Sequence, residues 1–321
     1  MKVSVVATVL NEIDTIERLL DSLVQQCRRP DEIIVVDGGS SDGTVEYLRR
    51  RRKQDDLLRV LVFPGLNIAG GRNKAIEASR CELIACIDAG AWATDNWLAE
   101  LLREFEDDPS VDVVGGSFRS DPANDFETVL GATTLPVPEE VDGETFLPSS
   151  RSVAFMKSAW SSVGGYPEWI DYCEDLIFDL ELKRQNFRFA YAPGAEVRFR
   201  PRPSVAAYFR QYYLYARGDG KADLWFKRHV IRYLTYATAP IAVILGLQNR
   251  LLWLVLLIAG MLYIKRPISR LCQMTEGWPV ERRLRALLMI PYLRLVGDVA
   301  KMAGYPAGVR WRLQRQKQGP R

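Results

Sequence analysis

The sequence contains few of the residues that usually hold metal ions or form disulfide bonds. It has one histidine, His229, and its five cysteines show no C-x-x-C spacing. These counts make a zinc site unexpected and argue against a disulfide framework in a chain of 321 residues. Because only one imidazole is available, we expect any general base to be a carboxylate.

Two common phosphate-binding loops are also missing. The turn at residues 37–44 has Gly38 and Gly43 at the spacing of a P-loop, but no lysine follows Gly43. A G-x-G-x-x-G segment does not occur anywhere in the chain. The net charge of +3 is small for 321 residues, so we expect no nucleic-acid partner.

No apolar run reaches the length of about 20 residues that a spanning helix needs. Two shorter runs, 233–247 and 251–264, are separated by a turn in which Arg250 is the only charge. The two apolar runs predict a membrane-associated hairpin at about 231–265. Because basic residues flank it on both sides, the positive-inside rule predicts that both of its ends face the cytosol. The alternatives are a hairpin buried in a soluble second domain and one that lies in the membrane interface. The flanking residues are Lys227, Arg228, Arg232, Lys265, Arg266 and Arg270.

The rest of the C-terminal part is basic and amphipathic. Residues 284–302 are largely apolar, and the interruptions by Pro291, Arg294, Asp298 and Lys301 predict an amphipathic, interfacial helix. The tail from Arg310 to Arg321 combines basic residues with Trp311 and suits either anionic headgroups or solvent. At the other end, the first apolar run stops at Asn11, too early for a signal peptide, so we expect a cytoplasmic catalytic part at the cell membrane.

The first half alternates short apolar runs with helical patterns, which predicts an α/β fold with a doubly wound, mainly parallel sheet. We expect this domain over residues 1–220, with long loops at 120–150, and a helical region with the apolar hairpin over 221–321. The predicted strands are 3–10, 32–36, 58–63, 83–87, 111–114 and a run from 152, and the predicted helices are 14–27, 44–52, 67–79, 94–106 and 174–185.

Acidic residues follow several of these strands. Glu12 comes after the first, Asp37 ends the second, Asp88 ends the fourth, and Glu174-Asp175 begin a later helix. Because ligands of open α/β sheets bind at the carboxyl ends of the strands, this predicts a site for a polar ligand such as a nucleotide, with a cation. One such acid alone would be an ordinary helix cap.

Together these segments resemble the family 2 glycosyltransferases of the GT-A fold. The resemblance covers about residues 1–220 and rests on segments 8–12, 37–44 and 67–78, on Asp88, and on the Glu174-Asp175 pair, in that order. It implies a nucleotide-sugar donor, with UDP as the expected nucleotide. An acceptor hydroxyl on a lipid-linked or surface glycan is also expected.

The resemblance assigns the donor side to the first half of the chain. Glu12 and Asp37 match positions that hold uracil and ribose, and carboxylates suit that task because they accept hydrogen bonds. Thr8, Asn11 and Gly39 belong to the same donor-binding segments. Arg72 lies in a segment near the nucleotide and is expected to pair with the diphosphate, with a surface position as the alternative.

The expected metal site departs from the family pattern. Asp88 matches the first acid of the D-x-D motif, which organises Mg²⁺ or Mn²⁺ at the diphosphate, but Gly90 replaces the second acid. Asp88 with the donor phosphates is then the expected ligand set. Asp95 is a nearby substitute that fits better as an acid in the first turn of the next helix.

The acceptor side is expected around the second acidic pair. Asp175 matches the general base that removes the acceptor proton, with Asp179 one turn later as its rival and Glu174 beside it. Tyr166 and Trp169 offer flat faces for sugar rings, unless they belong to the core.

These features predict an inverting glycosyltransferase. The chain lacks a Q-x-x-R-W segment, which favours transfer of one sugar at a time. A non-catalytic membrane protein that binds nucleotide-sugars is the alternative. A nucleotidyltransferase is disfavoured because the loop after the first strand, residues 11–14, is acidic rather than basic.

Overall fold

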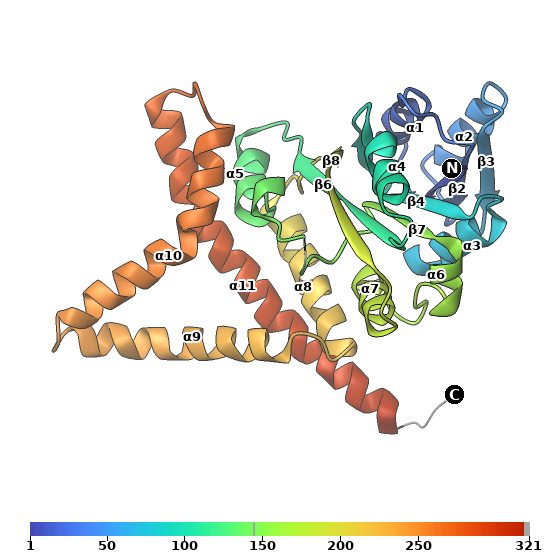
Figure 1. The fold of residues 1–321 in the computed structure, drawn as a ribbon. Helices are drawn as coiled ribbons and strands as arrows, with labels where there is room; N and C mark the ends of the chain where they lie inside the picture. Colours follow the sequence, from blue (N-terminus) through green and yellow to red (C-terminus); the bar gives the residue numbers. More distant parts are fainter. Residues whose placement is uncertain (144, 318–321) are drawn as a thin grey trace. The chain divides into compact units, whose positions relative to one another are not determined.

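The structure is a computed structural model that describes residues 1–143 and 145–317 (Figure 1). It divides into two compact units, the first made of residues 1–121 and 137–200, the second of 122–136 and 201–321. The first unit ends at Arg200, ahead of the boundary at residue 220 that the sequence predicted. The reason is that residues 205–221 form a helix that packs along the last helix of the second unit.

The first unit is built around an eight-stranded sheet in the order β3-β2-β1-β4-β7-β6-β8-β5. Strands β3, β2, β1 and β4 are parallel, β7 is antiparallel to both its neighbours, β6 and β8 are parallel, and β5 is antiparallel to β8. The mixed, mainly parallel sheet confirms the predicted fold class. The strands are β1 Val3–Val9, β2 Glu32–Asp37, β3 Leu58–Val62, β4 Leu83–Ile87, β5 Ala91–Ala93, β6 Val113–Ser120, β7 Ser152–Met156 and β8 Phe189–Phe199.

Helices cover both faces of this sheet, because successive strand residues point to opposite sides. On β1, Val5 belongs to a core layer with α1 and α4, whereas Val6 belongs to a second layer with α3 and α7. This two-sided burial explains why the strands are apolar throughout rather than alternating. The helices are α1 Ile16–Val24, α2 Thr44–Arg52, α3 Ile68–Ala78, α4 Trp97–Asp107, α6 Lys157–Ser162 and α7 Glu174–Arg184, with a short 3₁₀ turn, η1 Pro138–Glu140.

The second unit is helical and contains α5 Asp125–Thr134, α8 Val205–Lys221, α9 Phe226–Gly246, α10 Leu251–Met274 and α11 Val280–Lys317. Helices α8 and α11 pack very closely. A side chain at Gly297 would meet the Tyr208 hydroxyl, and one at Gly304 would meet the Tyr213 carbonyl. Small residues therefore let the two backbones approach.

Helix α5 lies in the stretch that the sequence predicted as long loops, so that prediction is wrong there. Asn124 caps the helix by accepting from the backbone N–H of Glu127 at 3.0 Å, while Glu127 accepts from the Ala123 N–H at 2.8 Å. The arrangement resembles a capping box, except that Glu127 accepts from the residue before the N-cap and not from the N-cap itself.

The predicted hairpin is present as α9 and α10, joined by a turn at residues 247–250 (Figure 1). Within the described ranges, α10 is the one helix long and apolar enough to cross a membrane. The predicted interfacial helix at 284–302 and the tail up to residue 317 form one helix, α11, rather than a helix and a free tail. The tail residue Arg321 lies outside the described residues.

Candidate active site

The acidic residues predicted from the strand ends lie at one edge of the sheet. Asp37 is the last residue of β2, Asp88 directly follows β4, and Glu12 follows β1, which lies between these two strands. Gly90 adopts a φ of +76°, and a side chain there would start 3.5 Å from Oε2 of Glu12. The carboxyl ends of the parallel strands therefore form a shared acidic edge, as expected for a ligand site.

Arg72 connects this edge to helix α7. Its Nη2 lies 2.6 Å from Oδ1 of Asp88, and its Nη1 lies 2.6 Å from Oε1 of Glu174. Burial lowers the pKa of Arg72 and the two carboxylates raise it, with a net effect well above its ordinary value. The surface alternative for Arg72 is wrong, since the residue is 3% exposed. A contact with the donor diphosphate stays a prediction.

The pKa of Glu174 lies well above the ordinary value of a glutamate. Burial raises its pKa to about 7, although Arg72 acts in the opposite direction, and the neighbouring Asp175 adds to the rise. The desolvation of the carboxylate thus outweighs the ion pair. Glu174 lies behind Arg72 and is almost fully buried, so its immediate contact is this arginine.

Asp175 is the half-buried member of the acidic pair. Its Oδ1 accepts from the Leu176 N–H at 2.8 Å, and the Ser149 hydroxyl lies 3.5 Å from Oδ2. It lies in the first turn of α7.

Asp179, one turn later, has a different environment. It is 3% exposed, and its Oδ2 atom has no hydrogen-bond partner among the described residues. Burial and the nearby Asp175 raise its pKa well above the ordinary value. A neutral, enclosed carboxyl is a poor base, so the geometry favours Asp175 over this rival.

Asp37 organises the turn that follows β2. Its Oδ1 accepts from the N–H groups of Gly39 and Ser40, both at 2.8 Å, and its Oδ2 accepts from the Ser40 hydroxyl at 2.6 Å. Since the residue is fully buried, the expected direct contact with a nucleoside does not fit this position. The correction has a physical cause, because the turn itself uses the carboxylate.

The exposed rim of the turn is locked to the loop after β1. Asn11 donates its N–H to the Ser40 hydroxyl at 2.8 Å and accepts from the Ser41 N–H at 2.9 Å. Glu12 donates its N–H to the Thr44 hydroxyl at 3.0 Å and accepts from the Thr15 hydroxyl at 2.5 Å. The two predicted donor-binding segments thus form one surface.

Two other predicted donor-binding residues act through packing. The Thr8 side chain contacts α3 where a side chain on Gly71 would come within 2.8 Å of it. Gly39 has a φ of +101°, and its Cα faces Pro64, so a side chain there would be both strained and crowded. Thr8 and Gly39 therefore contribute to the site by packing against the elements that form it.

The predicted aromatic pair is split. The Tyr166 ring stacks on Phe178 with centroids 4.3 Å apart and is 2% exposed, so its predicted role as a sugar platform is wrong. The ring belongs to the core, and burial raises the pKa of its hydroxyl well above the usual range. Trp169 is 43% exposed, on a loop that Asn67 and Asn73 hold against α3.

The sequence reasoning missed Arg151. Its Nε lies 3.7 Å from Oδ2 of Asp88, and its guanidinium lies 4.2 Å from the centre of the Phe199 ring and 5.5 Å from that of Phe118. Asp88 therefore faces two arginines. Arg151 follows a Pro-Ser-Ser stretch directly before β7 and carries no local signal of its own.

The side chains around Asp88 do not by themselves form a complete metal-binding site. Both oxygens of Asp88 face arginines, and Gly90 contributes no carboxylate. The described residues contain no group of three or more His, Cys, Asp or Glu side chains placed to hold an ion. Any cation at Asp88 must therefore take most of its ligands from another molecule.

Family models match most of the chain. The model described as glycosyl transferase family 2 matches residues 4–151, and that described as glycosyl transferase family group 2 matches residues 83–297. The two overlapping matches cover both the acidic strand ends and the Glu174-Asp175 pair.

Individual relatives are more distant. Poly-beta-1,6-N-acetyl-D-glucosamine synthase of Staphylococcus aureus (strain MSSA476) is 26% identical over 192 residues, which are 58% of this chain and 46% of that protein. EpsH of Bacillus subtilis (strain 168) is 33% identical over 106 residues, 33% of this chain and 31% of that protein. The chain thus spans less than half the length of these curated relatives.

A solved structure shares the fold. It is the mannosyltransferase PcManGT from Pyrobaculum calidifontis in complex with GDP-Man and Mn²⁺, with a TM-score of 0.57 and 20% sequence identity. The similarity covers 98% of this chain and 88% of that one. At this identity the likeness supports the fold alone.

Proposed function

The chain belongs to glycosyl transferase family group 2, and on this premise we propose that it is an inverting glycosyltransferase that uses a nucleotide-diphosphate sugar. The observation that carries the proposal is the bridge from Asp88 through Arg72 to Glu174, next to Asp175. One buried arginine fixes the distance between the strand edge and the first turn of α7. A donor at the edge and a base on the helix are then held in one geometry.

Asp175 is the residue that takes the proton in this proposal. An acceptor hydroxyl attacks the anomeric carbon from the face opposite the diphosphate, and a carboxylate on that side removes the hydroxyl proton as the bond forms. Attack from the opposite face inverts the anomeric configuration. Ser149, 3.5 Å from Asp175, is placed to hold the carboxylate in its orientation.

Arg151 and Arg72 supply positive charge at the donor side. The leaving diphosphate gains negative charge as the glycosidic bond breaks, and guanidinium groups stabilise such charge through paired hydrogen bonds. Arg151 is 20% exposed along its side chain, whereas Arg72 is enclosed by its two carboxylates. The more accessible Arg151 is therefore the better candidate for direct contact with the diphosphate.

The nucleoside is expected on the surface formed by Asn11, Glu12 and the turn after β2. Glu12 keeps an accessible carboxylate there, and Ser40 and Ser41 present the rim of the turn. Asp37 contributes indirectly, because its carboxylate accepts hydrogen bonds that stabilise the turn. UDP stays the expected nucleotide, and a donor screen with UDP-, GDP- and dTDP-sugars by calorimetry is the direct test.

Mg²⁺ or Mn²⁺ enters the proposal as an ion that arrives with the donor. Among the described side chains, Asp88 is the expected protein ligand. The mannosyltransferase structure of similar fold contains Mn²⁺ with its GDP-Man, and we propose that an ion of this kind arrives with the donor here.

The second unit is proposed to associate with the membrane. Large apolar side chains on α9 and α10 are exposed, for example Ile244 at 64% and Leu262 at 67%. Exposed apolar area of this extent on a monomer marks an interaction surface. Together with α10 as a candidate span, it supports a membrane location, with a cytoplasmic catalytic domain as the accompanying expectation.

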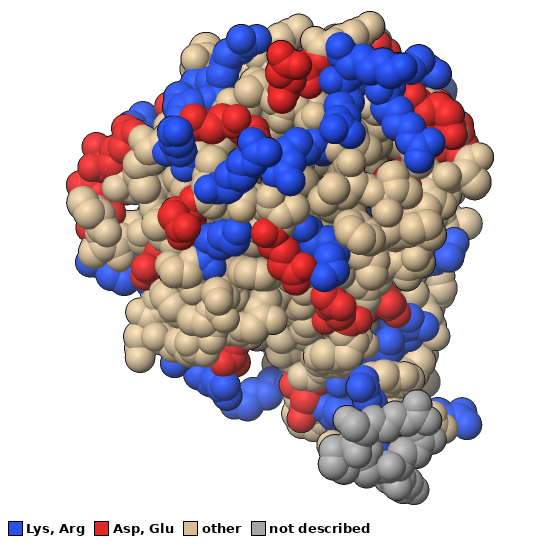
Figure 2. Space-filling view, turned by 90° about the vertical axis from the view of Figure 1, so that its right-hand side faces the viewer, with Lys and Arg blue, Asp and Glu red and all other residues tan. Residues whose placement is uncertain are grey.

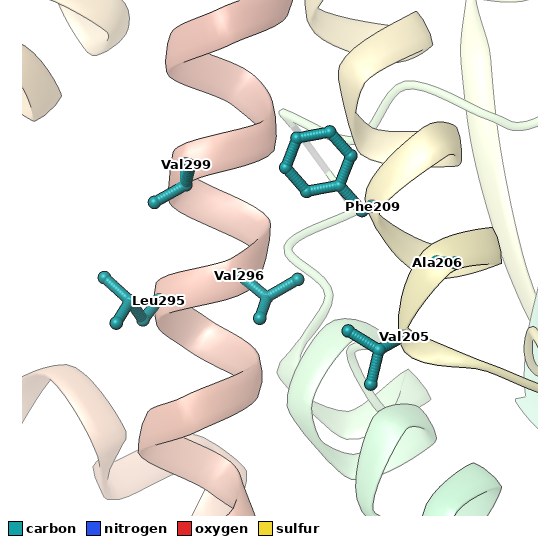
Figure 3. Close-up of a pocket in the computed structure, with 6 residues that line it drawn as sticks. All are labelled: Val205, Ala206, Phe209, Leu295, Val296 and Val299. Carbon is teal, nitrogen blue, oxygen red and sulfur yellow. The ribbon is translucent and has the colours of Figure 1, made fainter.

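Helix α11 adds an apolar stripe that supports the same proposal. A groove of about 670 Å³ between α8 and α11 has an entirely apolar side-chain lining (Figure 3). In that view Phe209 and Val296 point into the space between the helices. Exposed apolar residues recur at helical spacing along α11, as an interfacial helix requires. They are Leu284, Leu288, Tyr292, Leu295 and Val299.

A membrane-facing helical unit favours an acceptor that is lipid-linked or part of a surface glycan. The face in Figure 2 shows Lys and Arg interspersed with Asp and Glu. Among the described residues, most of the exposed large apolar side chains belong to helices α9, α10 and α11.

The alternative is a non-catalytic protein that binds nucleotide-sugars, and one variant separates the two. Asp175→Asn is expected to abolish transfer while donor affinity, measured by calorimetry, changes little. The chain purified in detergent should transfer sugar from at least one donor in the screen. Donor binding without any turnover in the wild type, with Mn²⁺ present, would support the alternative and contradict the transferase.

A further inference from the structure

The helical unit contains a polar cavity that the transferase proposal does not use. It has a volume of about 100 Å³ and lies among α5, α8, α10 and α11. Its wall includes two threonines of α5, the tyrosines Tyr208, Tyr212 and Tyr263, and the charged residues Arg294, Asp298 and Lys301 of α11. At roughly 30 Å³ per water, the space is large enough for about three waters or one compact polar group.

The one acidic residue in this wall is already neutralised. Oδ1 of Asp298 accepts from Nε of Arg232 at 2.9 Å. Oδ2 accepts from the hydroxyls of Tyr236, at 3.0 Å, and Tyr263. Asp298 therefore belongs to a closed network with Arg232, which lies on α9.

The two cations in the wall have no such partner. Among the described residues, neither Arg294 nor Lys301 forms a salt bridge within 4.0 Å. Arg294 donates Nη2 to the Tyr263 carbonyl at 3.0 Å and lies over that tyrosine's ring at 4.4 Å, but its buried Nε has no hydrogen-bond partner within the described part of the chain. Lys301 Nζ lies 4.8 Å from the centre of the Tyr212 ring.

The wall of the cavity carries more positive than negative charge. Burial, Arg232 and Arg294 lower the pKa of Lys301, Asp298 and Asp219 raise it, and the net result is a pKa of about 8. Buried cations are costly unless an anion neutralises them and satisfies their donors. The cavity thus has the polarity, the donors and the space for an anion.

We propose that this cavity binds a phosphate group through Arg294 and Lys301. An arginine fork and a lysine ammonium together match the several oxygens of a phosphate, and the nearby tyrosine rings position both cations. The frame is rigid because Tyr208 fits against Gly297, where a side chain would clash with its hydroxyl. The phosphate belongs either to a lipid headgroup or to a free phosphate compound, and the proposal is independent of the transferase activity.

The test measures thermal unfolding of the full chain in neutral detergent. The probes are inorganic phosphate against chloride at equal ionic strength, and micelles containing phosphatidic acid against micelles containing phosphatidylglycerol. A ligand that binds the folded state raises the unfolding midpoint, here by about 2 °C or more at saturation. Lys301→Met and Arg294→Gln remove the cations, and Lys227→Met removes an exposed cation of the same unit as a matched control.

We expect the wild type and Lys227→Met to respond, and the two cavity variants to lose the response. Because Lys301→Met removes a buried charge without an ion-pair partner, it should fold at least as stably as the wild type without ligand. A response to inorganic phosphate supports a free-phosphate source, and a response to phosphatidic acid alone supports a lipid source.

Three results would overturn the proposal. One is no midpoint shift with either probe. Another is an equal shift in wild type and Lys301→Met, since phosphate also stabilises proteins generally by exclusion from their surface. The third is an equal loss in Lys227→Met, which would indicate diffuse attraction rather than a site.

Discussion

Nη2 of Arg72 lies 2.6 Å from Oδ1 of Asp88, and this contact joins helix α3 to the end of strand β4. The same guanidinium continues to Glu174 at the start of α7. One buried side chain thus joins two consecutive elements, α3 and β4, to helix α7, and Arg72 and Glu174 are 102 residues apart in the chain. The proposed donor edge and the proposed base cannot move independently while this bridge holds.

Removing the bridge is expected to destabilise the protein strongly. Arg72→Met leaves Asp88 and Glu174 without their buried cation, which typically costs about 3–5 kcal/mol. Chemical denaturation measures the loss. Arg103→Met is the matched control, because Arg103 is half-exposed and pairs with Glu100 on its own helix, an interaction worth less than about 1 kcal/mol. Equal losses in the two variants would contradict the structural role of Arg72.

The stability of the protein is expected to depend on pH through Glu174. Its pKa is about 7 in the folded chain against an ordinary value of 4.5, so the folded state holds the proton more tightly than the unfolded state. Stability from this group therefore falls as pH rises from about 4.5 to about 7.

Glu174→Gln removes this titration. The difference in unfolding free energy between variant and wild type should change across the same pH range, as measured by denaturation at several pH values. Asp179 titrates in the same direction but is present in both proteins, so it cancels in the difference. A difference that stays constant from about pH 4.5 to about pH 7 would contradict the raised pKa.

The assignment of the base predicts unequal effects at neighbouring positions. Asp175→Asn should lower the transfer rate by roughly 10²–10⁴-fold, the usual contribution of a general base. Asp179→Asn should change the rate by a few-fold at most, because its buried carboxyl is held in the neutral form that asparagine resembles. Transfer assays on both variants, with donor affinity measured in parallel, check this. A larger loss at Asp179 would reverse the assignment.

Arg151 is expected to act on the leaving group. Arg151→Met should lower kcat/KM by roughly 10²-fold through the lost stabilisation of the diphosphate. Arg198→Met is the control, since Arg198 is half-exposed and pairs with Glu196 within its own strand. An unchanged kcat/KM in Arg151→Met would remove this residue from the mechanism.

Metal binding should require the donor. Because Asp88 faces two arginines and Gly90 offers no carboxylate, Mn²⁺ titrated into the full chain alone is expected to give no heat of specific binding. The same titration with UDP or GDP present should show binding, and chelation with EDTA should reverse it. Tight Mn²⁺ binding in the absence of nucleotide would show a protein-built site and contradict a ligand set of Asp88 and donor phosphates.

Local patterns carried enough information to predict most elements. The alternation of apolar runs and helical segments placed the parallel strands, because strand and helix periodicities differ and are visible within a few residues. The acids after β1, β2 and β4 were found for the same reason. Helix α5 was missed although Asn124 is a favourable N-cap residue at its start, since the prolines and glycines nearby are typical of loops.

The roles of individual side chains were harder to predict from the sequence. Tyr166 and Trp169 are close in the sequence, yet one ring is in the core and the other is exposed, because only the packing of Phe178 against Tyr166 decides which is enclosed. Arg151 has no sequence signal, since its partners Asp88, Phe118 and Phe199 come from three separate segments.

The turn at residues 37–44 shows the difference between what local sequence determines and what depends on tertiary structure. The sequence by itself determined that an acid ends a buried strand, that glycines allow a sharp turn, and that the turn lies at the binding edge of a sheet. Only the tertiary structure decided that Asp37 serves the turn, that Arg72 joins Asp88 to Glu174, and that α8 belongs with α11. Periodicity and turn chemistry act between neighbours in the chain, whereas burial and ion pairing depend on which distant segments meet.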